Sequence, residues 1–170
     1  MPAPHSLPAA DKPDTGANLY RRSLYTFWKR TVAPPDMIAF DAAGRETCIV
    51  RQTRTNTPLQ ALTLMNDVTY VEASRALAQR VLIEETTPER RLTRMFRLLA
   101  ARRPRPTELT VLCANLEQHR TRYRRDRQAA LKLISVGESK RDEKLEVAEL
   151  AAYTAAANLI LNLDETITKE

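Results

Sequence analysis

The sequence is poor in the residues that build compact chemical sites. It contains only three glycines, two cysteines and two histidines among 170 residues. The scarcity of glycine argues against a turn-rich β-sandwich or barrel and against a glycine-rich phosphate loop. Two cysteines allow at most one disulfide and exclude a disulfide scaffold. Two histidines leave almost no room for a histidine-built metal site, so we expect no metal in this chain.

Long apolar runs and an export signal are also missing. The longest apolar stretch, residues 151–163, is interrupted by threonine and asparagine and is too short and polar to span a bilayer. Residues 1–14 have neither the basic start nor the apolar run of a signal peptide. Four prolines there predict an extended, disordered lead-in, which we place at residues 1–18, ahead of one domain over residues 19–170.

What the sequence does contain is a globular composition with an uneven charge. Hydrophobic residues make up 43% and charged residues 28%, and the net charge is +6. The positive excess lies in residues 87–127, which hold twelve arginines against four acids. Such a segment can bind nucleic acid, an acidic polymer or anionic lipid. Only Phe96 and Tyr123 lie among these arginines, whereas base stacking needs interleaved aromatics, so we favour a solvated helix face over a nucleic-acid patch.

A capping signal marks the first clear helix. Thr57 precedes a proline and stands three residues before Gln60, which is the pattern of a capping box. Leu59, Leu62 and Met65 then fall on one helix face, as in an amphipathic helix.

Further capping residues divide the rest of the chain into helices. Asp67 and Thr87 can each cap a helix, and Thr107 begins another that we expect to run to Gly137. A last helix is predicted over residues 142–163, where closely spaced alanines allow a neighbour to approach.

The N-terminal third has less regular patterns. Residues 19–32 are aromatic and basic, and their spacing fits a helix or a strand. Residues 36–56 form a long connection in which residues 48–50 read as a short strand. The sequence thus predicts a mainly α fold: an irregular bundle of four to five helices, with a loop-rich N-terminal third and room for a short β pair.

The densest polar stretch immediately precedes the helix that begins after Thr57. A helix N-terminus offers free N–H groups and a partial positive charge, so phosphate, sulfate, a sugar acid or a carboxylate would fit there. The alternative, which we favour, is that Thr57 fills the cap and the arginines brace the connection. The candidate binding residues are Arg45, Glu46, Arg51, Arg54, Asn56 and Gln60.

Catalytic signals are weak. Two of five carboxylates outside the amphipathic patterns could act as an acid–base pair: Asp41, Glu46, Asp67, Asp164 and Glu165. Helix capping or pairing with nearby arginines is the more common fate of such carboxylates, and we favour it. Cys113 reads as a buried small hydrophobe and His119 as a surface residue, and neither stands in a nucleophile motif. No catalytic residue is assigned, and we lean against an enzyme in this chain alone.

An ordered series of motifs resembles a known family. It consists of Arg21-Arg22-Ser23-Leu24-Tyr25, Trp28-Lys29-Arg30, Pro34-Pro35, Phe40-Asp41-Ala42, Arg45-Glu46-Thr47-Cys48 and Arg54-Thr55-Asn56-Thr57-Pro58-Leu59-Gln60-Ala61-Leu62, then Asn66 and Asn162-Leu163-Asp164-Glu165. The series, from about residue 19 to 165 and most specific over residues 45–66, resembles the C-terminal part of the planctomycete-type domain of unknown function numbered 1553.

The resemblance implies a context but no activity. Such domains end long exported proteins, after another domain of unknown function and often a cytochrome-c-like or carbohydrate-binding-like module. It therefore implies an exported or periplasmic location, an upstream domain as partner, and haem only in an upstream module. This sequence lacks a signal peptide, a haem motif and the upstream half, which favours a fragment or a detached module.

Three functions follow as hypotheses. The first is a non-catalytic structural or interaction module, with apolar surface exposed in the region of residues 19–56 where another domain would dock. The second is part of an enzyme acting on polysaccharide or another acidic polymer. The third is nucleic-acid binding through the arginine-rich segment, residues 87–127.

Overall fold

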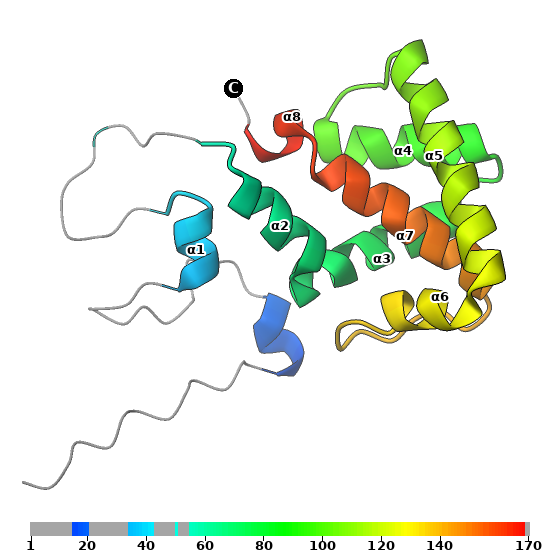
Figure 1. Cartoon of the computed structure of the whole chain (residues 1–170), viewed down its shortest axis with the longest axis horizontal. Helices are drawn as coiled ribbons and strands as arrows, with labels where there is room; N and C mark the ends of the chain where they lie inside the picture. Colours follow the sequence, from blue (N-terminus) through cyan, green and yellow to red (C-terminus); the bar gives the residue numbers. More distant parts are fainter. Residues whose placement is uncertain (1–14, 21–33, 43–49, 51–54, 169–170) are drawn as a thin grey trace, which may run out of the picture.

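The computed structural model describes residues 15–20, 34–42, 50 and 55–168 (Figure 1). These residues contain eight α-helices and one 3-10 helix and no strand, so the predicted mainly α fold is confirmed. Most of the predicted aromatic segment 19–32 and of the predicted strand 48–50 lies outside the described residues. The elements are η1 Gly16–Tyr20, α1 Pro35–Ala39, α2 Pro58–Asn66, α3 Val68–Glu84, α4 Pro88–Ala100, α5 Pro106–Arg125, α6 Arg127–Ile134, α7 Val147–Leu161 and α8 Asp164–Ile167.

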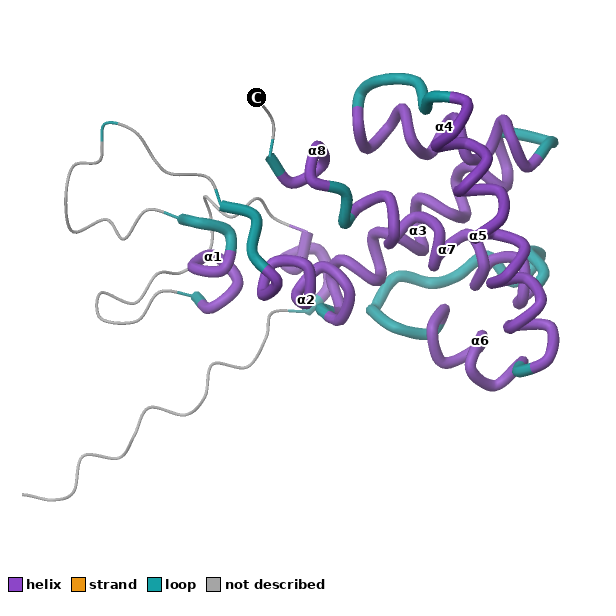
Figure 2. Tube along the Cα trace, turned by 45° about the horizontal axis from the view of Figure 1, so that its top comes forward, coloured by secondary structure: helices purple, strands orange, loops and turns teal. Residues whose placement is uncertain are grey.

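Helix α7 forms the centre of the fold. It crosses the middle of the body, and α3, α5 and α6 pack around it (Figures 1 and 2). Ten of its fifteen residues are buried, and five of these are alanines, whose small side chains let the neighbouring helices approach closely. Tyr153, Leu150 and Ile160 supply its large side chains and are fully buried. A helix that is apolar on every side is a core helix, and α7 occupies that place.

The predicted helix starts at Thr57, Asp67 and Thr87 are confirmed. Thr57 and Gln60 form a complete capping box, because the Thr57 hydroxyl accepts from the Gln60 N–H and the Gln60 side chain accepts from the Thr57 N–H at 2.9 Å. Asp67 caps α3 through the N–H of Thr69. Thr87 caps α4 through the N–H of Arg90. These local bonds satisfy donors that helix starts otherwise leave free.

Two helices differ from the sequence prediction because a local carboxylate sets their limits. The helix predicted from Thr107 to Gly137 begins at Pro106 and is divided in two, since the Asp126 carboxylate accepts from the Ala129 N–H at 2.9 Å and starts α6. The last helix, predicted over residues 142–163, is α7, which begins at Val147 because the Glu146 carboxylate caps it.

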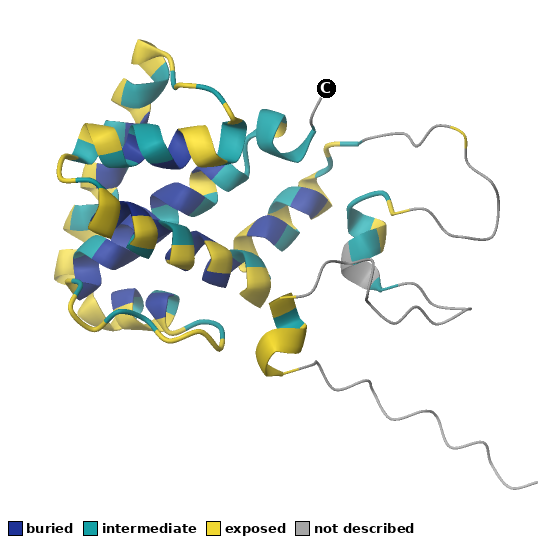
Figure 3. Cartoon of the chain, turned by 180° about the vertical axis from the view of Figure 1, so that it is seen from behind, coloured by how far each residue is buried: buried dark blue, intermediate teal, exposed yellow. Residues whose placement is uncertain are grey.

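Burial is concentrated where α3, α4, α5 and α6 meet α7. Figure 3 shows the buried residues along the facing sides of these helices, while α2 is largely exposed. The largest side chains of this core include Phe96, Met95 and Leu92 from α4 and Leu116 from α5. The body of the protein is therefore α3 to α7, with α2 lying at its edge.

Candidate functional site

The polar cluster predicted ahead of α2 is, in its described part, a network of internal hydrogen bonds. Asp41, with a left-handed φ of 57°, lies after α1. Its carboxylate accepts from the Thr55 N–H at 2.7 Å and from the Thr55 hydroxyl, and more distantly from the Gln60 amide. These donors, the Thr55 N–H first, hold the pKa of Asp41 below its ordinary value. A carboxylate occupied in this way holds the chain in place.

The two described members of the candidate binding set lie in different surroundings. Gln60 is 1% exposed, and both ends of its amide serve the α2 cap and the Asp41 cluster. Asn56 is exposed and donates to the Asp164 carboxylate at 2.6 Å, which joins the start of α2 to α8. The other candidates, Arg45, Glu46, Arg51 and Arg54, lie outside the described residues, so an anion site there stays a prediction.

The apolar stripe that the sequence places on α2 does not enter the core. Leu59, Leu62 and Met65, together with Val68 at the start of α3, are each between 56% and 59% exposed. The buried side of α2 consists instead of Gln60 and Leu64. We call the exposed set Leu59, Leu62, Met65 and Val68 the α2 face. Single exposed apolar residues are ordinary, but a group along one helix is typical of an interaction surface.

Exposed apolar side chains also occur in the N-terminal third. Tyr20 is 56% exposed, Ile38 59% and Val50 fully exposed. The other described large apolar residues of residues 19–56, where exposed apolar surface was predicted, are partly buried: Leu19, Met37 and Phe40. The exposure of the first three agrees with that hypothesis without identifying what would cover them.

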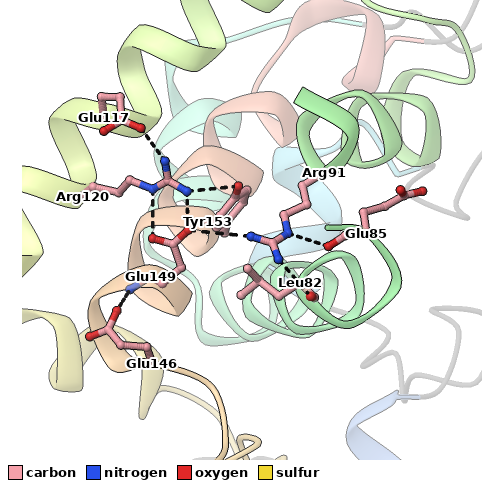
Figure 4. A network of polar contacts seen from close by, with 8 residues as sticks. All are labelled: Leu82, Glu85, Arg91, Glu117, Arg120, Glu146, Glu149 and Tyr153. Atoms are coloured by element: carbon pink, nitrogen blue, oxygen red, sulfur yellow. Dashed lines mark hydrogen bonds and ion pairs between the residues drawn. The ribbon is translucent and has the colours of Figure 1, made fainter. Parts of the chain in front are cut away.

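Several arginines of the basic segment form ion pairs within the protein. Arg120 on α5 pairs with Glu117 of its own helix and with Glu149 on α7 (Figure 4). Arg94 lies 3.4 Å from Glu84, which also pairs with Arg80. These contacts connect helices, so part of the segment serves the fold. The remaining arginines are spread over α4, α5, α6 and the loop between α4 and α5.

The buried ring of Tyr153 lies between two of these arginines. The guanidinium carbons of Arg91 and Arg120 lie 5.7 and 5.6 Å from the ring centre, within the range of cation–π contacts (Figure 4). Arg91 also donates to the backbone oxygen of Glu85 at 2.8 Å, at the end of α3. Burial raises the pKa of the Tyr153 hydroxyl, so it stays protonated at neutral pH. This arrangement joins α3, α4, α5 and α7.

Arg102 fastens the loop between α4 and α5 to the C-terminal helix α8. Its guanidinium donates to Glu108 and to Glu165, with the closest bond to each at 2.7 Å, and lies 4.8 Å from the Phe96 ring centre. The contact with Arg102 lowers the pKa of Glu108 to about 2. The three partners are on α4, α5 and α8, so the role of Arg102 is to hold these elements together.

A buried acid joins the N-terminal turn to the loop between α6 and α7. Glu72 on α3 is 5% exposed and accepts from the N–H groups of Glu138 and Ser139 and from the Tyr20 hydroxyl. Arg75, also buried, neutralises it and donates to Ser139. Apart from the Nε of Arg75, which has no hydrogen-bond partner among the described residues, these groups bond to one another, so the cluster is a structural junction.

The two isolated residues considered for chemistry are packed against the body. His119 is partly exposed and stacks on Tyr123 with ring centres 6.0 Å apart, and burial lowers the pKa of its imidazole below 6.5. Cys113 packs against the core, partly buried. Among the described residues no group of three histidine, cysteine or acidic side chains is placed to hold a metal ion. None of the described helices is long and apolar enough to cross a bilayer.

Sequence reasoning placed Leu59, Leu62 and Met65 on one helix face but did not add Val68 or identify the face as a surface. The sequence did carry a signal: the nine residues of α2 include no charged side chain, whereas exposed helices of this arginine-rich chain carry several. Charge depletion on a helix at the edge of the body is a property of interface centres. The local signal of Glu72 was only its spacing to Arg75, three residues on. This is because its other partners, Tyr20, Glu138 and Ser139, lie 52 to 67 residues away along the chain.

Comparison with known proteins gives a family and no function. The model of the family described as PSD1, protein of unknown function (DUF1553), matches residues 2–116. No curated protein and no solved structure matches the chain.

Proposed function

The chain belongs to the PSD1 family of proteins of unknown function (DUF1553), and on this premise we propose that it is a non-catalytic interaction module. Its partner is another domain of a longer exported protein, which docks on the α2 face. The observation that carries the proposal is that the four apolar side chains of the α2 face, three on α2 and one at the start of α3, are all more than half exposed. Covering them would remove apolar area from water, which is the main driving force for association.

The chemistry of the α2 face specifies the kind of partner. Because α2 carries no charged side chain, an acidic polymer or a nucleic acid would find no cation on it. An uncharged apolar protein surface matches it, since the centres of protein interfaces are depleted of charge. The resemblance to C-terminal parts of longer proteins favours a domain of the same polypeptide as that surface.

The alternative hypotheses have less support from the geometry. An enzyme acting on a polysaccharide would need free carboxylates facing one another, whereas the Asp41 carboxylate is occupied by Thr55 and Gln60. Nucleic-acid binding would need arginines free to reach phosphates, and Arg91, Arg94 and Arg120 form ion pairs within the body.

Hydrogen–deuterium exchange in two contexts tests the proposal. The α2 amides are measured in this chain produced alone and in the complete product of its gene. Docking stabilises α2, so we expect its amides to exchange at least about tenfold more slowly in the complete product. Leu62→Asp, which places a charge in the centre of the α2 face, should return exchange in the complete product to the rate of the isolated chain.

Val111→Asp is the matched control, because Val111 is 64% exposed on α5, away from the α2 face. It should leave the α2 amides protected. Equal exchange of α2 in the two proteins would overturn the proposal. A dimer of the isolated chain that Leu62→Asp dissociates would also overturn it, by making a second copy the occupant.

A further inference from the structure

A cavity of about 260 Å³ adjoins the α2 face, and its wall comes from α2, α3, α5, α6 and α7. Met65 of the α2 face lines it, and so does Leu159 of α7, which is 40% exposed. The apolar surface of the α2 face thus continues across Met65 into the cavity. A partner that covers the α2 face would therefore also cover this opening.

The part of the wall that comes from α2 is fixed to the body. The side chain of Asn158 on α7 also lines the cavity and donates to the backbone oxygen of Leu64 at 2.9 Å. This bond joins the residue next to Met65 to α7. Leu64 itself is 3% exposed, so the end of α2 is packed against the body. The cavity is therefore present in the chain by itself, as small binding pockets usually are before they are occupied.

The chemistry of the wall favours an aromatic ring. His119 and Tyr123 line the cavity from α5 and stack on one another, with ring centres 6.0 Å apart and ring planes 17° from parallel. Aromatic rings in contact attract one another beyond the area that they bury. Met65 adds a thioether, which adapts its shape and makes favourable contacts with aromatic rings. A further ring in the cavity would gain from both contacts, whereas an aliphatic side chain would gain from burial alone.

Charge and size limit what can enter the cavity. No lysine, arginine, aspartate or glutamate is among the described residues that line it, and burial lowers the pKa of His119, so that its ring is neutral at neutral pH. An ammonium or a carboxylate would lose water there without gaining a counter-ion. An apolar protein cavity of about 150 Å³ can hold one benzene molecule, so this cavity has room for a single side chain.

We propose that the partner domain is anchored by one aromatic side chain, which enters this cavity and contacts Met65, His119 and Leu159. The inference rests on the proposed function, because the partner is the domain that docks on the α2 face. The α2 face contributes apolar area, and the cavity contributes the place where one residue of the partner is fully removed from water. Protein interfaces typically depend on a few such aromatic residues in pockets near their centre.

The first test titrates the whole chain with benzyl alcohol, an uncharged probe that carries one aromatic ring. Binding is followed by NMR of the imidazoles, because the chain has only two histidines and the His119 signal is identified by its loss in His119→Gln. The His119 signal should shift with saturation. Cyclohexylmethanol, which has a similar size and no aromatic ring, should bind at least about threefold more weakly.

The second test measures hydrogen–deuterium exchange of the α2 amides in the complete product of the gene, with the cavity closed in two ways. Ala155→Leu fills the cavity from its wall, and Leu159→Trp places a ring of the chain itself at the opening. Leu159 is partly exposed, so this second variant needs no room in the core. Each variant should remove most of the roughly tenfold protection of α2. Ala114→Leu, a matched change at an exposed position of α5 outside the lining, should leave the protection unchanged.

The outcomes separate this inference from the proposed function. Equal exchange of α2 in the isolated chain and in the unaltered complete product would overturn both. Protection of α2 that survives Ala155→Leu and Leu159→Trp but not Leu62→Asp would overturn the anchor alone, since docking would then occur without it. The anchor is also overturned if benzyl alcohol causes no saturable shift of His119, or if it binds no better than cyclohexylmethanol.

Discussion

Helices α2 and α7 both carry few charged side chains, but their surroundings differ. The nine residues of α2 include no charged side chain, and the fifteen residues of α7 include one, Glu149. Yet α7 is buried on almost every side, whereas α2 buries only Gln60 and Leu64 and exposes its leucine and methionine stripe. Neighbouring helices pack around α7, while α2 lies at the edge of the body (Figure 3).

The difference shows that a helix with few charges is suited to burial, but that its composition does not determine which neighbouring helices cover it. The alanines of α7 let three helices approach it within the described chain. The large side chains of α2 have no comparable neighbours there. We interpret α2 as a core helix whose exposed face packs against a partner. This interpretation is the premise of the proposed function.

The largest expected effect separates the two helices directly. Leu150→Ala on α7 removes a fully buried side chain and should lower the free energy of unfolding by about 2–5 kcal/mol. Leu62→Ala on α2 removes an exposed one and should change it by about 0.5 kcal/mol or less. Urea unfolding followed by circular dichroism measures both. Comparable losses of unfolding free energy in the two variants would show that the α2 face is buried in the folded chain. The contrast between α2 and α7 would then be wrong.

A smaller effect on stability compares two glycines, one in the loop between α6 and α7 and one in the N-terminal turn. Gly137, with a φ of 91°, leaves no space for a side chain, since an added Cβ would lie 2.2 Å from the Glu72 carboxylate. Gly137→Ala should therefore cost about 3 kcal/mol, from backbone strain and from displacement of Glu72. Gly16, with a φ of 62°, has open space around it, so Gly16→Ala should cost about 1 kcal/mol or less.

Thermal unfolding of the two glycine variants gives the comparison. A Gly137→Ala variant as stable as Gly16→Ala would mean that Glu72 moves aside without loss, and that the junction it forms contributes little.

The smallest effect concerns how α2 and α5 begin. Both helices start with a backbone N–H that donates to the side chain three residues ahead, to the neutral Gln60 in α2 and to the Glu108 carboxylate in α5. Glu108 has its pKa lowered from 4.5 to about 2, so its contribution is present above pH 4.5 and is lost as the pH falls toward 2. Glu108→Gln should therefore reduce the dependence of the unfolding free energy on pH between pH 4.5 and pH 2.

The comparison variant is Glu143→Gln, because Glu143 is exposed on the loop before α7, outside the ion pairs described for the body. It should leave the slope between pH 4.5 and pH 2 unchanged. Equal slopes for Glu108→Gln and the unaltered chain, measured by chemical unfolding at each pH, would contradict the role given to Glu108.

Local signals predicted the fold well. Thr57, Asp67 and Thr87 began helices as expected because the cap bonds join residues two or three apart. The long helix expected from Thr107 to Gly137 was wrong as one element, since periodicity continued through Asp126 while its carboxylate capped a new helix. Periodicity identifies residues that share a face, and capping side chains decide where a face is interrupted.

The candidate site was less predictable because it depends on contacts between distant residues. Gln60 could be placed at a helix start, but its burial follows from the approach of Asp41 and Thr55. Arg120 belonged to a segment that read as solvated, yet its carboxylate partner Glu149 lies 29 residues away on α7. Which face a helix leaves uncovered is set by the other helices, so the exposure of the α2 face required the fold.

Glu72 places the N-terminal turn and the loop between α6 and α7 under one constraint. It holds the Tyr20 hydroxyl and the N–H groups of Glu138 and Ser139 with the same two oxygens. Detachment of the N-terminal turn would therefore remove one donor from the Oε1 atom that also accepts from the Ser139 N–H, and would break the bond from the Gly16 N–H to Glu138. Both losses would loosen the loop before α7, more than a hundred residues along the chain. The backbone N–H groups of Glu138 and Ser139 therefore report, from a distant part of the chain, whether the N-terminal turn is bound to the body.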